Sequence, residues 1–210
     1  MDLQNADYEV EFRCHFENVD EANAKIPFLA SCLQRRTDWV TTFYGLDLFR
    51  SGYLLRVSDI FTGSERKYYI GWKGRDIGEF ANIRPELDEE ATDGIAHSLI
   101  LEWLGVIKTA LNPQEIVPEL ERSGYQKFMS FQGNDFAGYY EPLDIYVKLM
   151  SCPVLKWPLL VEIEQMAKTE EDAKECERNL QELCRQMQLQ EYVVREEPPL
   201  LLYSQIFDLK

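Results

Sequence analysis

Two pairs of carboxylates at a two-residue spacing are the groups of this sequence with the clearest chemical potential. Glu9 and Glu11 precede Arg13, and Glu162 and Glu164 repeat the spacing far along the chain. In a β-strand this spacing puts the members of a pair on one face, about 6.5–7 Å apart. Carboxylates from two strands suit a hard divalent cation such as Mg²⁺ or Mn²⁺. Each pair alone is typical of a solvated strand face, so it is their repetition that favours a metal site.

A second group of residues, all cations, would suit a polyphosphate. A triphosphate carries about four negative charges, and Arg offers it bidentate contacts while Lys offers a compact point charge. Any one of these cations alone is typical of ordinary surface charge. The sequence has no Gly-x-x-x-x-Gly-Lys-Ser/Thr motif, which excludes a P-loop. The candidates in or near expected strands are Arg56, Lys73, Arg84 and Arg122.

Composition excludes several other classes of protein. The 210 residues include 22 basic and 37 acidic side chains, for a net charge of −15, and 45% of the residues are hydrophobic. Such a chain is expected to be globular, and its acidity argues against nucleic-acid binding. Since no apolar run approaches 18 residues and the first 20 carry no apolar segment, we expect neither a membrane span nor a secretory signal.

Cysteine and histidine usage points in the same direction. The five Cys include no C-x-x-C pair, and the two His have no partner at metal-ligand spacing. A disulfide framework, a zinc site and a His-based catalytic triad are therefore disfavoured, and a reducing, cytoplasmic location is expected.

Alternation of apolar and polar residues is the main structural signal. A strand places alternate residues on opposite faces, so each alternating segment has one apolar and one charged side. Five such segments predict an antiparallel sheet that is closed or strongly curved, in a protein of the α+β class. The segments begin at Tyr8, Tyr53, Tyr68, Leu143 and Leu159.

Helical spacing and breakers complete the expected elements. Helices are predicted over 92–108 with Thr92 as N-cap, over 170–188 with Thr169 opening it, and over 20–35 with a start or kink at Pro27. Residues 200–207, after two prolines, suggest a final edge strand. Without a Gly/Ser-rich linker or a repeat, one domain over 1–210 is the simpler interpretation, with 111–118 as its best internal seam.

Five short motifs occur in the order found in one family of proteins. The motifs are Tyr8-Glu-Val-Glu-Phe-Arg13, Tyr53-Leu-Leu-Arg-Val57, Trp72-Lys-Gly74, Arg84-Pro-Glu86 and Val161-Glu-Ile-Glu164. With them the chain resembles the CYTH family, the triphosphate tunnel metalloenzymes, which include class IV adenylate cyclases, thiamine triphosphatases and inorganic tripolyphosphatases. Tyr203 lies where related cyclases end in a Tyr-containing strand.

The resemblance implies a closed eight-stranded antiparallel β-barrel with flanking helices, whose hydrated lumen binds a triphosphate and one or two divalent metals. A lumen of this kind also explains how so many charges could lie inside a barrel, because a dry core would not tolerate them. The carboxylates implied to hold Mg²⁺ or Mn²⁺ are Glu9, Glu11, Glu86, Glu162 and Glu164, of which all but Glu86 are also the implied catalytic residues. The implied phosphate-binding cations are Arg13, Arg56, Lys73, Arg84 and Arg122.

Three of the chain's departures from the family pattern concern basic residues. Arg13 stands where the family's opening motif has Lys, and Ser58 and Leu120 stand where the family has cations. Two phosphate-binding charges of the family are thus missing from this sequence.

The leading functional interpretation is metal-dependent hydrolysis of inorganic tripolyphosphate or an organic triphosphate. The alternatives are a class IV-like adenylate cyclase that makes cyclic AMP and pyrophosphate, a non-catalytic phosphate-binding barrel, and a purely structural interaction barrel. The expected partner is a triphosphate-containing small molecule, with no nucleic acid and no membrane. The sequence leaves a homodimer open.

Overall fold

The computed structural model describes residues 6–106 and 110–207, and eight long strands dominate it. Their hydrogen-bonded order is β5-β4-β3-β2-β6-β7-β8-β1, the two-residue strand β9 (Val193–Val194) adds to β1, and β5 also pairs with β1. That last pairing closes the sheet, so the expected α+β fold with a closed eight-stranded antiparallel β-barrel is confirmed. The long strands are β1 (Asp7–His15), β2 (Arg35–Tyr44), β3 (Leu54–Thr62), β4 (Glu65–Lys73), β5 (Asn82–Glu90), β6 (Lys127–Tyr140), β7 (Ile145–Ser151) and β8 (Leu159–Ala167).

Seven α-helices and two short 3₁₀ helices accompany the strands in the described residues. None of the described helices is long and apolar enough to cross a membrane. The helices are α1 (Val19–Lys25), α2 (Leu29–Cys32), α3 (Leu46–Arg50), α4 (Leu99–Trp103), α5 (Pro113–Arg122), η1 (Glu141–Leu143), α6 (Glu170–Gln186), η2 (Gln190–Tyr192) and α7 (Pro198–Phe207).

The chain forms two compact units, and none of their boundaries lies at the expected seam, 111–118: one falls in the loop before β5 and the others fall in strands. Unit 1 comprises residues 1–7, 38–76 and 84–132, and unit 2 comprises residues 8–37, 77–83 and 133–210. The segment 111–118 lies within unit 1, where its two prolines belong to α5. The single-domain interpretation stays a prediction.

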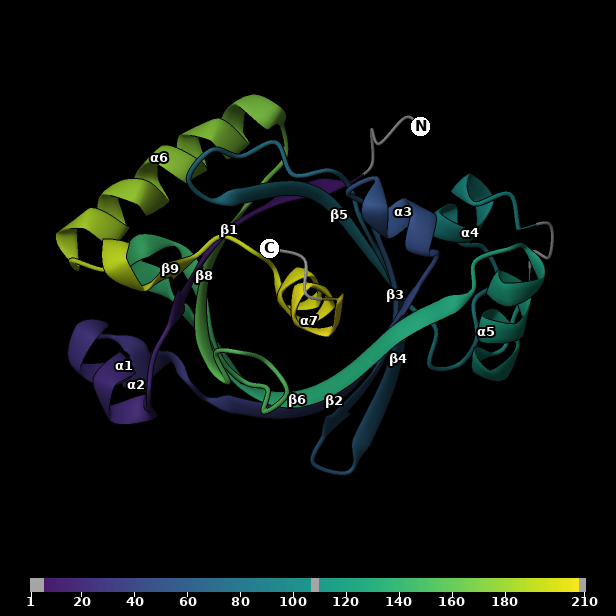
Figure 1. Cartoon of the computed structure of the whole chain (residues 1–210), viewed down its shortest axis with the longest axis horizontal. Helices are drawn as coiled ribbons and strands as arrows, with labels where there is room; N and C mark the ends of the chain where they lie inside the picture. Colours follow the sequence, from purple (N-terminus) through teal and green to yellow (C-terminus); the bar gives the residue numbers. More distant parts are fainter. Residues whose placement is uncertain (1–5, 107–109, 208–210) are drawn as a thin grey trace. The chain divides into compact units, whose positions relative to one another are not determined.

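Unit 2 has an apolar core on one face of β1, β7 and β8. Val10 and Phe12 of β1 are at most 2% exposed and pack with Val161 and Ile163 of β8. Helix α6 packs on β8 and adds Ala173, Leu180 and Cys184 to this core; Figure 1 shows it lying beside these strands. Because strand faces alternate, the charged residues of β1 and β8 lie on the face opposite this core.

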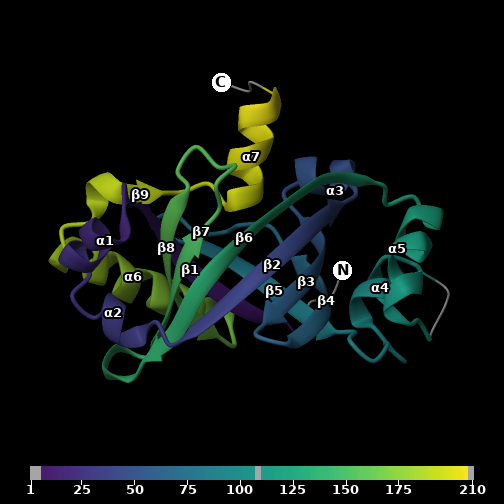
Figure 2. The same cartoon turned by 90° about the horizontal axis from the view of Figure 1, so that it is seen from below.

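Unit 1 also has an apolar core on one face of its strands, formed by other elements. Leu55 and Val57 of β3, with Ile70 and Trp72 of β4, form a core with helices α4 and α5. These two helices lie side by side in Figures 1 and 2. Arg56 therefore lies on the face of its strand opposite the helices, and so does Lys73 of β4.

The predicted helices agree with the structure to different degrees. Helix α6 begins as expected, since the Thr169 hydroxyl accepts a hydrogen bond from the Asp172 N–H. The predicted 92–108 helix is shorter: α4 spans only Leu99–Trp103, Ser98 caps it, and residues 107 and 108 lie outside the described residues. The predicted 20–35 helix is two helices, α1 and α2, with Pro27 between them.

The predicted edge strand near the end of the chain is wrong. Residues Pro198–Phe207 form α7, and Tyr203 lies on this helix rather than on a strand. Proline is favourable at the first helical position, where no intrahelical N–H bond is lost. The three leucines that follow are good helix formers, so the two prolines start a helix here instead of protecting a sheet edge.

Candidate functional site

Pairing between β1 and β8 brings the two predicted carboxylate pairs together in unit 2. Glu11 lies opposite Glu164, and Arg13 lies opposite Glu162, in the antiparallel register. Residues directly opposite each other have their side chains on the same face of the sheet. The two-residue spacing that was visible in the sequence therefore becomes one continuous charged face in the structure.

Three of these carboxylates form a candidate metal site. Oxygens of Glu9, Glu11 and Glu164 all lie within 4.8 Å of one another. Glu9 is 8% exposed and Glu11 is 1% exposed. A close, largely buried set of carboxylate oxygens is the donor set that Mg²⁺ or Mn²⁺ prefers, so these residues fit such an ion.

Glu162 has different surroundings from the other three carboxylates. Its Oε1 accepts a hydrogen bond from Arg13 Nε at 2.8 Å, and its Oε2 accepts one from Lys148 Nζ at 2.8 Å. Burial by itself would raise the pKa of Glu162, but the charges of Lys148 and Arg13 outweigh burial and hold its pKa well below the usual range. Each oxygen of Glu162 thus contacts a protein cation.

Arg13 is the centre of this ion-pair network. Besides Glu162, its guanidinium donates to Glu11 and, at 2.7 Å, to Asn82 Oδ1, and Glu197 lies 3.9 Å away. Arg13 is only 2% exposed, and the three carboxylates keep its pKa above the usual value despite burial. All three guanidinium nitrogens are therefore engaged within unit 2, where they hold the carboxylates in place.

Lys148 is a member of this cluster that sequence reasoning missed. It lies on β7 opposite Glu162, and its side chain is 34% exposed. Burial would lower its pKa, but Glu162, Glu164, Glu9 and Glu11 outweigh this and raise the pKa well above its ordinary value. Lys148 lies between apolar residues in the predicted 143–149 strand. This alternation was the one sequence signal that could have placed its side chain on the charged face.

Unit 1 holds a second ion-pair network. Arg56 Nη2 donates to Glu86 Oε1 at 2.5 Å and to Asp88 Oδ2 at 2.7 Å. Lys73, which is 6% exposed, has its Nζ 3.3 Å from Glu86 Oε2. The structure thus brings together Arg56, Lys73 and Glu86, and it pairs the predicted metal ligand Glu86 with cations.

A glycine makes room for this second network. Gly71 lies opposite both Arg56 and Asp88 in the register of β4 with its neighbours. A Cβ at this position would overlap the Asp88 carboxylate and lie 2.7 Å from Arg56 Nε. The Arg56–Asp88 ion pair crosses over the position where any other residue would carry its side chain.

Arg84 and Arg122, both predicted to bind phosphate, have other surroundings. Arg84 is 4% exposed and donates to the carbonyls of Gly52 and Gly74, so it holds two loops of unit 1. Arg122 does not lie in or near a strand as expected: it ends α5, its side chain is 65% exposed, and its Nη1 lies 2.6 Å from Glu119 of the same helix. Two positions have no cation where the family pattern has one: Ser58, which is bonded to Thr41, and Leu120, which lies on the buried face of α5.

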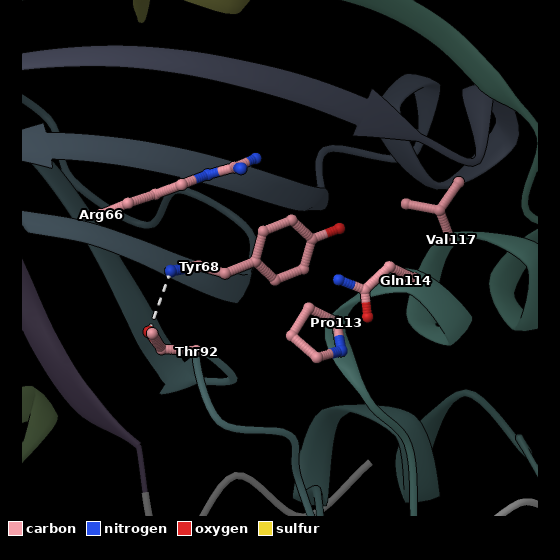
Figure 3. A pocket seen from close by; sticks show the side chains of 6 residues that line it. All are labelled: Arg66, Tyr68, Thr92, Pro113, Gln114 and Val117. Atoms are coloured by element: carbon pink, nitrogen blue, oxygen red, sulfur yellow. Dashed lines mark hydrogen bonds between the residues drawn. The ribbon is translucent and has the colours of Figure 1, made fainter.

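A cavity of about 290 Å³ lies elsewhere in unit 1. Its lining contains none of the predicted site residues. Figure 3 shows the Tyr68 ring between Arg66 on one side and Gln114 and Val117 on the other, with Pro113 and Thr92 completing the wall.

Comparison with known proteins gives a fold but no relative in sequence. No family model matches the chain, and no curated protein matches it. Solved structures do match. The PH1819 protein of Pyrococcus horikoshii aligns with a TM-score of 0.70 and 17% identity over 94% of this chain and 99% of that one.

Two further matches are described by an activity. An adenylate cyclase candidate from Vibrio parahaemolyticus has a TM-score of 0.66 and 14% identity, covering 95% of this chain and 99% of its own. The adenylyl cyclase candidate HpAC1 from Hippeastrum is described as having a dominant triphosphatase activity. It matches with a TM-score of 0.58 and 13% identity, over 95% of this chain and 96% of its own. The expected resemblance to the CYTH family is confirmed in the fold.

The same fold also occurs outside such enzymes. A chain of the Schizosaccharomyces pombe Mediator head module matches with a TM-score of 0.55 and 11% identity, over 86% of this chain and 94% of that one. Function therefore has to be argued from the side chains of this chain rather than from its fold.

Proposed function

We propose that this protein hydrolyses a triphosphate compound with the help of a divalent metal ion. The observation that carries the proposal is the cluster of Glu9, Glu11 and Glu164, whose carboxylate oxygens lie within 4.8 Å of one another on the charged face of unit 2. Names of proteins with the same fold, one described by a dominant triphosphatase activity, support the substrate class.

The proposal assigns metal binding to three carboxylates of unit 2. Glu9, Glu11 and Glu164 hold the ion, and Arg13 orients Glu11 through a direct ion pair. When bound, Mg²⁺ or Mn²⁺ neutralises charge that develops on the phosphoryl oxygens. Five carboxylates of this unit (Glu9, Glu11, Glu162, Glu164 and Glu197) outnumber its two clustered cations (Arg13 and Lys148), which favours a cation as the bound species.

In unit 1 we assign phosphate binding to Arg56 and Lys73. Both are held by Glu86, which fixes their direction before any ligand arrives, and a phosphate can take over the contacts that Glu86 now makes. Arg84 positions the backbone beside Lys73 through its bond to the Gly74 carbonyl. Arg122, exposed on α5, has no part in the proposed reaction.

Hydrolysis breaks one phosphoanhydride bond. A water oxygen attacks the terminal phosphorus and the water loses a proton to the solvent. The bond from that phosphorus to the bridging oxygen breaks, and the departing diphosphate, or diphosphate ester for an organic substrate, keeps the electron pair. The residues of this chain contribute by fixing the phosphates and by orienting the attacking water through a carboxylate. Glu164 is the partly exposed member of the acidic cluster and is the carboxylate that we assign to this second task.

The test replaces Glu164 by glutamine. Glu164→Gln removes one charged ligand, and losing several kcal/mol of charge stabilisation corresponds to a fall in rate of roughly 100-fold or more. Phosphate release from tripolyphosphate, thiamine triphosphate and ATP would be measured with Mg²⁺ and with Mn²⁺. Glu170→Gln, on the exposed surface of α6, is the matched control, and circular dichroism verifies the fold of both variants.

The outcome separates this function from its alternatives. Retained phosphate release in Glu164→Gln would contradict the proposal. Formation of cyclic AMP from ATP and Mn²⁺ would identify a cyclase, the activity suggested by the description of the Vibrio structure. Binding of tripolyphosphate without turnover would identify a phosphate-binding barrel, and absence of binding would favour an interaction role such as the Mediator match suggests.

A further inference from the structure

Lys148 places a positive charge beside Glu162 on the charged face of unit 2. Its Nζ lies 2.8 Å from Glu162 Oε2, and β7 sets it directly opposite Glu162 on the side away from Arg13. Glu162 therefore lies between two protein cations, one from each neighbouring strand. This arrangement differs from that of the other three carboxylates, whose oxygens gather into one cluster of their own.

This difference bears on the number of metal ions. Enzymes that use two ions for phosphoryl chemistry hold them about 3.5–4 Å apart with shared carboxylate ligands. A second ion coordinated by Glu162 would have to displace an ammonium or a guanidinium that is already bonded to that carboxylate. It would also stand next to the positive charge of Lys148, whose Nζ lies 2.8 Å from Glu162 Oε2.

An ammonium can do part of what such an ion does. It is a compact, positively charged group with three N–H donors, one of which reaches Glu162. It carries one positive charge where a divalent ion carries two, and it needs no free metal in solution. It is covalently part of the chain, so its presence beside Glu162 does not depend on the concentration of an ion in solution.

We propose that the Lys148 ammonium takes the place of a second divalent ion beside Glu162, so that the protein binds one ion, at Glu9, Glu11 and Glu164. The inference rests on the metal site of the proposed function but not on turnover. It makes Lys148 a residue that determines metal stoichiometry.

The experiment counts Mn²⁺ ions on the protein without any triphosphate. Isothermal calorimetry and electron paramagnetic resonance of the wild type are expected to give one bound Mn²⁺ per chain. Lys148→Met keeps the length of the side chain and removes its charge, and it is expected to raise the stoichiometry to two. Lys148→Arg keeps the charge and should stay at one, and Lys174→Met, on exposed α6, controls for the loss of a lysine elsewhere.

Two ions on the wild type would overturn the inference, and this measurement needs no variant to fold. A count that stays at one in a folded Lys148→Met variant would overturn it as well, and absence of any bound Mn²⁺ would remove both the inference and the proposed metal site. One Mn²⁺ on the wild type and two on Lys148→Met, with no phosphate release from any triphosphate, would support the inference and contradict the proposed hydrolysis.

Discussion

At the scale of single residues, the most consequential feature is that Arg13 and Glu162 are buried as a pair. Two buried charges stabilise a fold only when each has partners, and here Arg13 also bonds Glu11 and Asn82 while Glu162 also bonds Lys148. We infer that Arg13 acts by positioning carboxylates. The arginine that replaces the lysine of the family pattern supplies the three nitrogens that this task requires.

Removing the charge of Glu162 should destabilise the fold. In Glu162→Gln, Arg13 and Lys148 lose a shared carboxylate and face an amide, and breaking a buried pair in this way costs about 3–5 kcal/mol at neutral pH. Urea denaturation at pH 7 measures the difference. Glu170→Gln, which removes an exposed pair on α6, should change little, and an equal loss in both variants would contradict the assignment.

The same ion pair makes the stability of the fold depend on pH. The pKa of Glu162 is lower in the folded chain than in the unfolded chain, so the folded state binds fewer protons at this site. Its contribution is present above the unfolded pKa of about 4.3 and is lost as the pH falls towards the folded value. The difference between wild type and Glu162→Gln should therefore narrow below about pH 4.

At the scale of elements, one helix side chain holds the loop that leads into β5. The Glu177 carboxylate of α6 accepts hydrogen bonds from three successive backbone N–H groups, those of Glu79, Phe80 and Ala81, at 2.7–2.9 Å. The next residue, Asn82, begins β5 and accepts a hydrogen bond from Arg13. An exposed helix thus fixes the backbone that leads to the buried network of unit 2.

Loss of this anchor should loosen the loop. Glu177→Ala removes the acceptor of three N–H groups, each bond to a charged group being worth about 1.5–3 kcal/mol before the loop relaxes towards water. Hydrogen exchange of amides 79–81 should accelerate, while Glu177→Gln, which keeps one acceptor oxygen, should show a smaller change. Glu175→Ala on the same helix controls for helix propensity, and unchanged exchange at 79–81 would contradict this role.

At the scale of the whole molecule, the net charge of −15 favours the binding of cations over anions. Anionic substrates must therefore be recognised by local cations such as Arg56 and Lys73, or reach the protein with a metal. Each of the two compact units carries one network of charges on the strand face opposite its helices.

An ion that binds only the folded chain should raise the melting temperature. At a concentration about 100 times its Kd, the ion contributes about 2.7 kcal/mol of stability. In a chain of this length that corresponds to a shift of roughly 5–11 °C. Scanning calorimetry with Mn²⁺ and then with EDTA measures the shift, which should be small in Glu164→Gln; an equal shift in that variant would place the ion elsewhere.

Strands with clear alternation could be predicted from the sequence, together with which face of each strand is apolar. Tyr8, Val10 and Phe12 against Glu9 and Glu11 can lie in a strand in only one way that buries the apolar side, because the side-chain period is two. Thr169 likewise marked the start of α6 through local capping chemistry. Such features depend on neighbours in the chain, which a sequence displays.

The tertiary structure alone decided which charges meet. The register sets Glu162 opposite Lys148, 14 positions away, and opposite Arg13, 149 positions away, and no local pattern encodes the choice of the distant partner. It also decided that Arg122 lies on a helix surface and that residues after Pro198 form a helix. The free energy gained by burial depends on how the whole chain packs rather than on any short segment. The partners of a charged residue can therefore be identified only in the folded structure.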